Sequence, residues 1–180
     1  MLILLFTGNS GVGKTTIAGQ LSEDTAAPLL VEREIFRELA HERGHERGRH
    51  LLAAIGLTEL LRLARDRTLK HVAKIEPVPL LLLDGAYDLE LQHAFLREVP
   101  TADIRTVVIT APLDIRLQRV AQRLGETSLT NAQREISFLD ELKILAGMPT
   151  LISKAWLTLP NTGTVAEACA TIRDTLKSRV

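Results

Sequence analysis

Short apolar runs alternate along this chain with longer segments in which apolar residues recur at helical spacing. The apolar runs are nearly continuous, which is typical of strands buried on both faces of a parallel sheet. We therefore predict a five-stranded, mainly parallel sheet with strands at Leu2–Phe6, Leu29–Val31, Leu80–Leu83, Ile104–Ile109 and Trp156–Leu159.

The segments between these strands favour helices. The clearest one begins after Pro112 and ends before Gly125, with its apolar stripe formed by Leu113, Leu117, Val120, Ala121 and Leu124. Two further helices are predicted to begin at capping boxes, formed by Thr130 with Gln133 and by Thr164 with Glu167. The alternation of strands and helices predicts right-handed crossovers and a three-layer α/β/α domain.

Composition limits the kinds of protein that this chain can be. Its 180 residues, 46% of them hydrophobic, are enough for one packed domain spanning 1–180. A formal net charge of zero argues against a surface that binds nucleic-acid polymers. The opening run lacks a basic leader, no apolar stretch approaches membrane-spanning length, and the single cysteine, Cys169, rules out an internal disulfide. We therefore expect a cytoplasmic protein that does not act at a membrane.

The segment after the first predicted strand carries the motif with the clearest chemical meaning. Its letters "GNSGVGKTT" satisfy G-x-x-x-x-G-K-[ST], between a buried strand and an amphipathic helix. In such a P-loop the backbone N–H groups and the helix N-terminus bind phosphate, Lys14 reaches the β- and γ-phosphates, and the Thr15 hydroxyl ligates Mg²⁺. The predicted nucleotide-binding residues are Gly8, Asn9, Ser10, Gly11, Val12, Gly13, Lys14, Thr15 and Thr16.

A second metal ligand is predicted at the end of the third strand. Asp84 in "LLLLDG" follows a buried strand, and ligands of open α/β sheets gather at the carboxyl ends of the strands. Asp84 would hold Mg²⁺ with Thr15, although Asp-Gly after a strand is also a common turn.

Three arginines on the helix after the fourth strand suggest phosphoryl transfer. The guanine-selecting motif N-K-x-D of GTPases does not occur in the sequence. Arg116, Arg119 and Arg123 share one helix face and lead into the polar loop "RLGETSLT", which has the length of a small lid at about 119–131. We expect Arg119 and Arg123 to close over the phosphates; the alternative is a solvated charged face.

The order of these motifs resembles the small P-loop kinases. "GNSGVGKTT", "LLLLDG", "VVITAPLDIRLQRVAQRLG" and "LPNTGTVAEA" follow one another as in nucleoside monophosphate kinases, dephospho-CoA kinase and AAA-type kinase-like ATPases. The resemblance implies ATP and Mg²⁺ as cofactors. It also implies that Asn161–Gly163 lies near the adenine, unless this turn only leads to the Thr164 cap.

The same resemblance assigns an acceptor side to the helical segment at about 32–76. In "REIFRELAHERG", Glu34 and Arg37 match the acid and arginine that address the acceptor in relatives. Glu34 replaces the commoner Asp, and "DGAYD" from Asp84 to Asp88 lacks the Arg that often follows Asp-Gly. Because both departures lie on the acceptor side, the acceptor of dephospho-CoA kinase does not carry over to this chain.

A duplicated word produces a match to the zinc-peptidase signature. "HERGHERGRH" contains H-E-x-x-H, in which two histidines on one helix, here His41 and His45, would bind zinc. The duplication of H-E-R-G generates this match by itself, and the third histidine of the extended motif is replaced by Leu51. We interpret the segment as the end of the acceptor-side helix and the start of a mobile, cationic surface.

Together these patterns predict a Mg²⁺- and ATP-dependent kinase for a small anionic metabolite or nucleotide. Lys14, Arg119 and Arg123 would stabilise the transferring phosphoryl group, while Glu34 and Arg37 would bind the acceptor. The alternative is a regulatory ATPase switch that binds a protein partner and has no small acceptor.

Overall fold

The computed structural model describes residues 1–85, 88–125 and 129–178, which contain a five-stranded parallel sheet in the order β2-β3-β1-β4-β5. All five predicted strands are confirmed, with ends that shift by at most one residue. The strands are β1 (Leu2–Thr7), β2 (Leu29–Val31), β3 (Leu80–Asp84), β4 (Asp103–Thr110) and β5 (Leu157–Pro160).

The central strand β1 lies between β3 and β4. Phe6, near its carboxyl end, pairs with Asp84 on one side and with Val107 on the other. Because all strands are parallel, their carboxyl ends meet at one edge of the sheet. The P-loop that follows β1 and the carboxylate of Asp84 are therefore neighbours.

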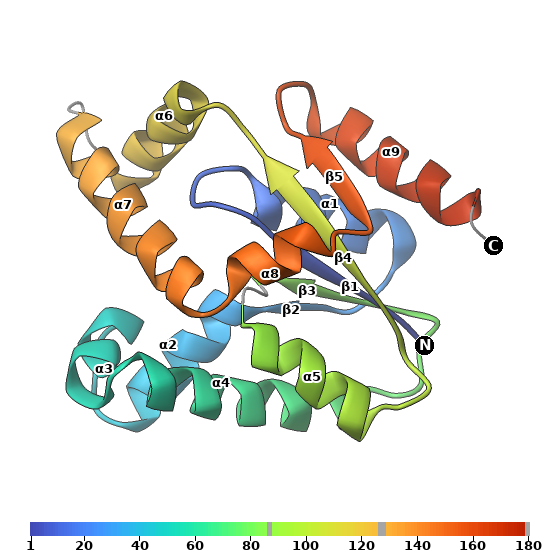
Figure 1. Ribbon diagram of the computed structural model, residues 1–180, viewed down its shortest axis with the longest axis horizontal. Coiled ribbons are helices and arrows are strands. Elements are labelled where there is room, and N and C mark those ends of the chain that lie inside the picture. The colour runs from blue at the N-terminus through green and yellow to red at the C-terminus, as the bar shows by residue number, and fades with distance from the viewer. Residues whose placement is uncertain (86–87, 126–128, 179–180) are drawn as a thin grey trace.

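Helices cover both faces of the sheet, as the apolar runs predict (Figure 1). They are α1 (Lys14–Thr25), α2 (Glu32–Glu42), α3 (Gly48–Ile55), α4 (Leu57–Val72), α5 (Leu89–Glu98), α6 (Leu113–Leu124), α7 (Leu129–Leu145), α8 (Met148–Ser153) and α9 (Val165–Lys177). On one face Phe6 packs with Ile17 of α1 and Ile172 of α9. On the other, Leu5 packs with Val72 of α4 and Phe95 of α5. The three-layer α/β/α fold is confirmed.

Two groups of helices flank the carboxyl edge of the sheet in Figure 1, α2 to α4 on one side and α6 with α7 on the other. The first group has its own apolar cluster, which includes Ile35, Leu39, Leu51 and Leu60. The second is joined by Val120, Ala121, Ala132 and Ile136. The predicted lid at 119–131 includes residues 126–128, which lie outside the described residues.

The two predicted capping boxes have different outcomes. The Thr164 hydroxyl accepts from the N–H of Glu167 at 3.2 Å, and Glu167 Oε2 accepts from the N–H of Thr164 at 2.7 Å, so this box is confirmed. The box at Thr130 is wrong, because α7 begins at Leu129 and Thr130 already lies inside the helix. The Gln133 side chain instead donates to the Ser137 hydroxyl, one turn further on.

The H-E-R-G repeat spans a helix end. Helix α2 ends at Glu42, Gly44 has a φ of +73°, and the N–H of His45 donates to Ala40 O. His41 and His45 therefore do not share one helix face, which the zinc-peptidase geometry requires. Within residues 1–85, 88–125 and 129–178, no three His, Cys, Asp or Glu side chains gather to hold a metal ion, and no helix is long and apolar enough to cross a membrane.

Candidate functional site

The P-loop turns sharply between β1 and α1, and two of its glycines are required by close contacts. Gly8 has a φ of +134°, and a Cβ there would lie 2.2 Å from the carbonyl oxygen of Ile109. Gly13 has a φ of +92°, and a Cβ there would lie 2.4 Å from Nδ2 of Asn161. Only glycine tolerates both the backbone conformation and the crowding at these positions.

The P-loop borders a cavity of about 620 Å³ at the carboxyl edge of the sheet. Its lining brings together the predicted residues Ser10, Gly11, Gly13, Lys14, Thr15, Thr16, Asp84, Arg119, Arg123 and Asn161. Gly8, Asn9 and Val12 belong to the loop but are not part of this lining. Glu34 and Arg37 do not line it either.

Lys14 folds back over its own loop. Its Nζ donates to the carbonyl oxygens of Gly8 and Asn9, each at 3.0 Å. Burial lowers the pKa of Lys14, and the nearby charge of Asp84 partly offsets this effect. The side chain lies beside the loop N–H groups, where a phosphate would be bound.

Thr15 and Asp84 meet as predicted. The Thr15 hydroxyl donates to Asp84 Oδ2 at 2.5 Å, and burial raises the pKa of Asp84 despite this bond. The buried Oδ1 of Asp84 has no hydrogen-bond partner among the residues that the structure describes. A hydroxyl and an unsatisfied carboxylate oxygen are hard ligands that suit Mg²⁺, which normally retains several waters and phosphate oxygens besides one or two protein ligands.

The arginines of α6 occupy three different environments. Arg116 is buried and donates from Nε to Ser10 O at 2.8 Å, so the alternative of a fully solvated face is wrong for this residue. Arg119 donates to Val12 O at 3.1 Å and to Asn161 O at 3.3 Å. Arg123 is exposed and lies at the rim of the cavity.

Asn161 supports the loop from the end of β5. Its side chain is buried, and Nδ2 donates to Val12 O at 2.7 Å. Gly163 and Val165, just beyond it, line the cavity. The predicted contact of Asn161–Gly163 with adenine stays a prediction, and it fits this end of the cavity.

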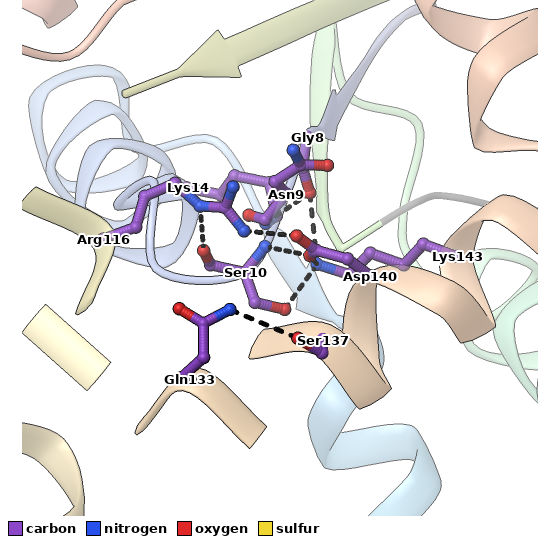
Figure 2. A network of polar contacts seen from close by, with 9 residues as sticks. All are labelled: Gly8, Asn9, Ser10, Lys14, Arg116, Gln133, Ser137, Asp140 and Lys143. Carbon is purple, nitrogen blue, oxygen red and sulfur yellow. Dashed lines mark hydrogen bonds and ion pairs between the residues drawn. The ribbon is translucent and has the colours of Figure 1, made fainter. Parts of the chain in front are cut away.

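Two charged residues of α7 reach the P-loop and were not predicted (Figure 2). Asp140 Oδ1 accepts from the N–H of Ser10 at 2.7 Å, and its other oxygen accepts from Arg116. Lys143 Nζ donates to Gly8 O at 3.2 Å and to the Ser10 hydroxyl at 3.0 Å. Burial, followed by the charge of Lys14, lowers the pKa of Lys143 to about 6.

A signal for this pair was present in the sequence. Asp140 and Lys143 continue the helical spacing of Ala132 and Ile136, which are buried residues of the same helix. Charged residues on an otherwise apolar stripe indicate a buried polar partner, because an unpaired buried charge is costly.

Glu32 is a further missed residue, at the first position of α2. It lines the cavity, and burial, followed by the charges of Asp88 and Asp84, raises its pKa well above the usual range. Its buried Oε2 has no hydrogen-bond partner within the described part of the chain. The acid that faces the cavity is thus two residues before Glu34, the predicted one.

The predicted acceptor pair lies on the outer surface of α2. Arg37 donates to Glu34 at 2.5 Å, and their side chains are 64% and 40% exposed. Arg33 and Phe36 of the same helix line the cavity instead. The structure therefore does not bring Glu34 and Arg37 to the P-loop.

Comparison with known proteins agrees with this fold. The fold is similar to that of shikimate kinase from Aquifex aeolicus, with a TM-score of 0.65 and 20% identity over 99% of this chain and 98% of that one. It is also similar to shikimate kinase from Acinetobacter baumannii in complex with shikimate, with a TM-score of 0.66 and 19% identity over 99% of this chain and 93% of that one. Shikimate kinase from Bacteroides thetaiotaomicron gives a TM-score of 0.69 and 16% identity over 98% of each chain. No curated protein matched the sequence. Residues 4–140, which run from β1 to Asp140 in α7, match the family described as AAA domain. The chain therefore belongs to this AAA domain family and has a kinase-like P-loop fold.

Proposed function

We propose that this protein is a Mg²⁺- and ATP-dependent phosphotransferase that acts on a small anionic metabolite or nucleotide. The observation that carries the proposal is that one cavity is lined both by the P-loop and by residues of α2 and α7. Lys14 and Thr15 lie in the P-loop wall, and the buried carboxyl group of Glu32 faces the same space from α2. A donor nucleotide and a small acceptor therefore have adjoining places.

The donor half accounts for most of the predicted residues. The loop N–H groups and Lys14 would hold the β- and γ-phosphates and stabilise the charge that develops during transfer. Arg119, already anchored to Val12 O, stiffens the loop, and Arg123 is placed at the rim to approach the phosphates. Thr15 and Asp84 would hold Mg²⁺, which neutralises phosphate charge when bound.

The acceptor half is built from α2 and α7. Glu32 would orient an acceptor hydroxyl, and once ionised it is a stronger base than an exposed glutamate because burial raises its pKa. Arg33 supplies a positive charge for an anionic group, while Phe36, Leu139 and Leu142 provide an apolar wall. That structural relatives include shikimate kinases supports a small-molecule acceptor. A regulatory ATPase switch would need no such acceptor end.

The test is to replace Lys14 by Ala and to use Lys154→Ala, at the exposed end of α8, as the matched control. Transfer from ATP would be measured by product detection with a panel of small hydroxylated acids and nucleotides. We expect Lys14→Ala to lower the rate by roughly 100-fold or more, because it removes a charge that stabilises the transition state. The control should keep the wild-type rate.

Two outcomes would contradict the proposal. One is wild-type transfer by the Lys14→Ala variant, which would mean that the P-loop is not the donor site. The other is ATP hydrolysis with no phosphorylated product from any acceptor, which would favour the switch.

A further inference from the structure

Three residues from α6 and α7 hold Ser10 of the P-loop on all its polar sides. Its N–H donates to Asp140, its carbonyl oxygen accepts from Arg116, and its hydroxyl accepts from Lys143. Asp140 and Arg116 are themselves an ion pair. We call these three residues, Asp140, Arg116 and Lys143, the Ser10 clamp. Within it, Arg116 largely neutralises the carboxylate of Asp140, which faces the loop.

Lys143 lies next to Lys14, the lysine of the P-loop motif. Its Nζ donates to Gly8 O at 3.2 Å, and Nζ of Lys14 donates to the same oxygen at 3.0 Å. Both side chains line the same cavity. Two amine groups that converge on one carbonyl oxygen are close enough together to contact the same anion in this cavity.

The charges around Lys143 place it toward the acceptor end. The groups that act on it electrostatically are Lys14 of α1, Asp140 of its own helix and Glu32 of α2, and Lys143 in turn acts on Asp84 of β3. Lys143 therefore contacts the P-loop at Gly8 O and is also near Glu32, the acidic residue of the acceptor half. A phosphoryl group leaving ATP for an acceptor would pass this position.

Packing alone does not account for a lysine here. The side chain is only 9% exposed, and Asp140 Oδ1 is 4.0 Å from Nζ, longer than a hydrogen bond. Two buried amines side by side repel one another when both are protonated, and a bound polyanion would offset that repulsion. An apolar residue of the same length would avoid that repulsion but would lose the hydrogen bonds to Gly8 O and to the Ser10 hydroxyl.

We propose that Lys143 is a second phosphate-binding lysine, which contacts the terminal phosphoryl group of ATP on the acceptor side of Lys14 while the Ser10 clamp fixes the loop. The inference rests on the proposed function, since it requires that the cavity binds ATP. It extends that function by giving the transferring group a protein contact on each side.

The test measures the affinities of ADP and of a non-hydrolysable ATP analogue by calorimetry, with Mg²⁺ and without acceptor. The variants are Lys143→Met and Lys143→Gln, and the control is Lys154→Met on the surface. We expect both Lys143 variants to bind the ATP analogue at least about 10-fold more weakly but ADP within about 3-fold of wild type, because one hydrogen-bonded contact to the terminal phosphate is lost. The control should match the wild type for both nucleotides.

The ratio of the two affinities separates this role from a structural one. A lysine that only shapes the loop would affect ADP and the analogue equally, and that result, or unchanged binding of both, would overturn the inference. Thermal unfolding checks that the variants fold, and Lys143→Gln retains a donor for Gly8 O should the Met variant be misfolded. If the wild type binds neither nucleotide, the proposed function fails, and this inference fails with it.

Discussion

Replacing Lys143 by Met should change how the free energy of unfolding depends on pH. The pKa of Lys143 falls from an ordinary 10.5 to about 6, mainly because the side chain is buried. Between these values the unfolded chain binds a proton that the folded protein does not, so the folded state gains stability as pH rises. The burial of Lys143 lowers the free energy of unfolding by its full amount below about pH 6 and has no effect above about pH 10.5. Between these values the free energy of unfolding rises by about 1.4 kcal/mol per pH unit.

The assay is urea unfolding of the nucleotide-free wild type and of Lys143→Met at about pH 6.5 and about pH 8.5. Over this span the wild type should gain about 3 kcal/mol relative to the variant, which is two pH units of the slope above. Lys14, Asp140 and Glu32 act electrostatically on Lys143 but are present in both proteins, so the difference between the proteins reports mainly the replaced group. Parallel pH profiles for the two proteins would refute the reasoning, because they would mean that Lys143 stays protonated in the fold.

Three further predictions concern the loop, the acceptor and the metal. Gly8→Ala should destabilise the protein by about 3 kcal/mol in urea unfolding, because its Cβ would meet Ile109 O, whereas Gly19→Ala in α1 has open space and should stabilise it slightly. Glu32→Gln should lower turnover of the true acceptor by roughly 100-fold, whereas Glu34→Gln on the outer face should leave turnover within about twofold of wild type. A larger loss in Glu34→Gln than in Glu32→Gln would instead support Glu34 as the acid that binds the acceptor. Protein treated with a chelator should lose transfer activity and regain it with Mg²⁺ but not with Zn²⁺, and tightly held zinc found by elemental analysis would contradict this.

The fold followed from the sequence because its main signal is local. A strand buried on both faces is apolar at most positions, so Leu80–Leu83 and the Val107–Ile109 run of β4 can be recognised without knowing their neighbours. The error at Thr130 has a local cause as well. A hydroxyl followed three residues later by Gln fits both a helix start and a helix interior, and only the backbone distinguishes them.

The donor side was predictable for the same reason, and the acceptor side was not. A P-loop is contiguous, so Gly8 to Thr16 appear together in the sequence. On α2, which side chains face the cavity depends on the residue at which the helix begins. Because it begins at Glu32, the helical repeat turns Glu32, Ile35 and Leu39 inward and leaves Glu34 on the opposite, exposed side.

The contacts of Asp140 and Lys143 of α7 with the P-loop could not be predicted, because they join parts of the chain that are far apart in sequence. Ser10 and Asp140 are separated by 130 positions, and no local pattern relates them. They meet because α7 packs on α6 through Val120 and Ile136, while Arg116 of α6 reaches Ser10. The helices that carry the cations over the cavity thus also contact the loop that would hold the phosphates, so the packing of α7 on α6 helps to set the position of Lys143 relative to the P-loop. A site built in this way holds its two lysines together on Gly8 O before nucleotide binds, as preorganised electrostatic stabilisation of a transferring phosphoryl group requires.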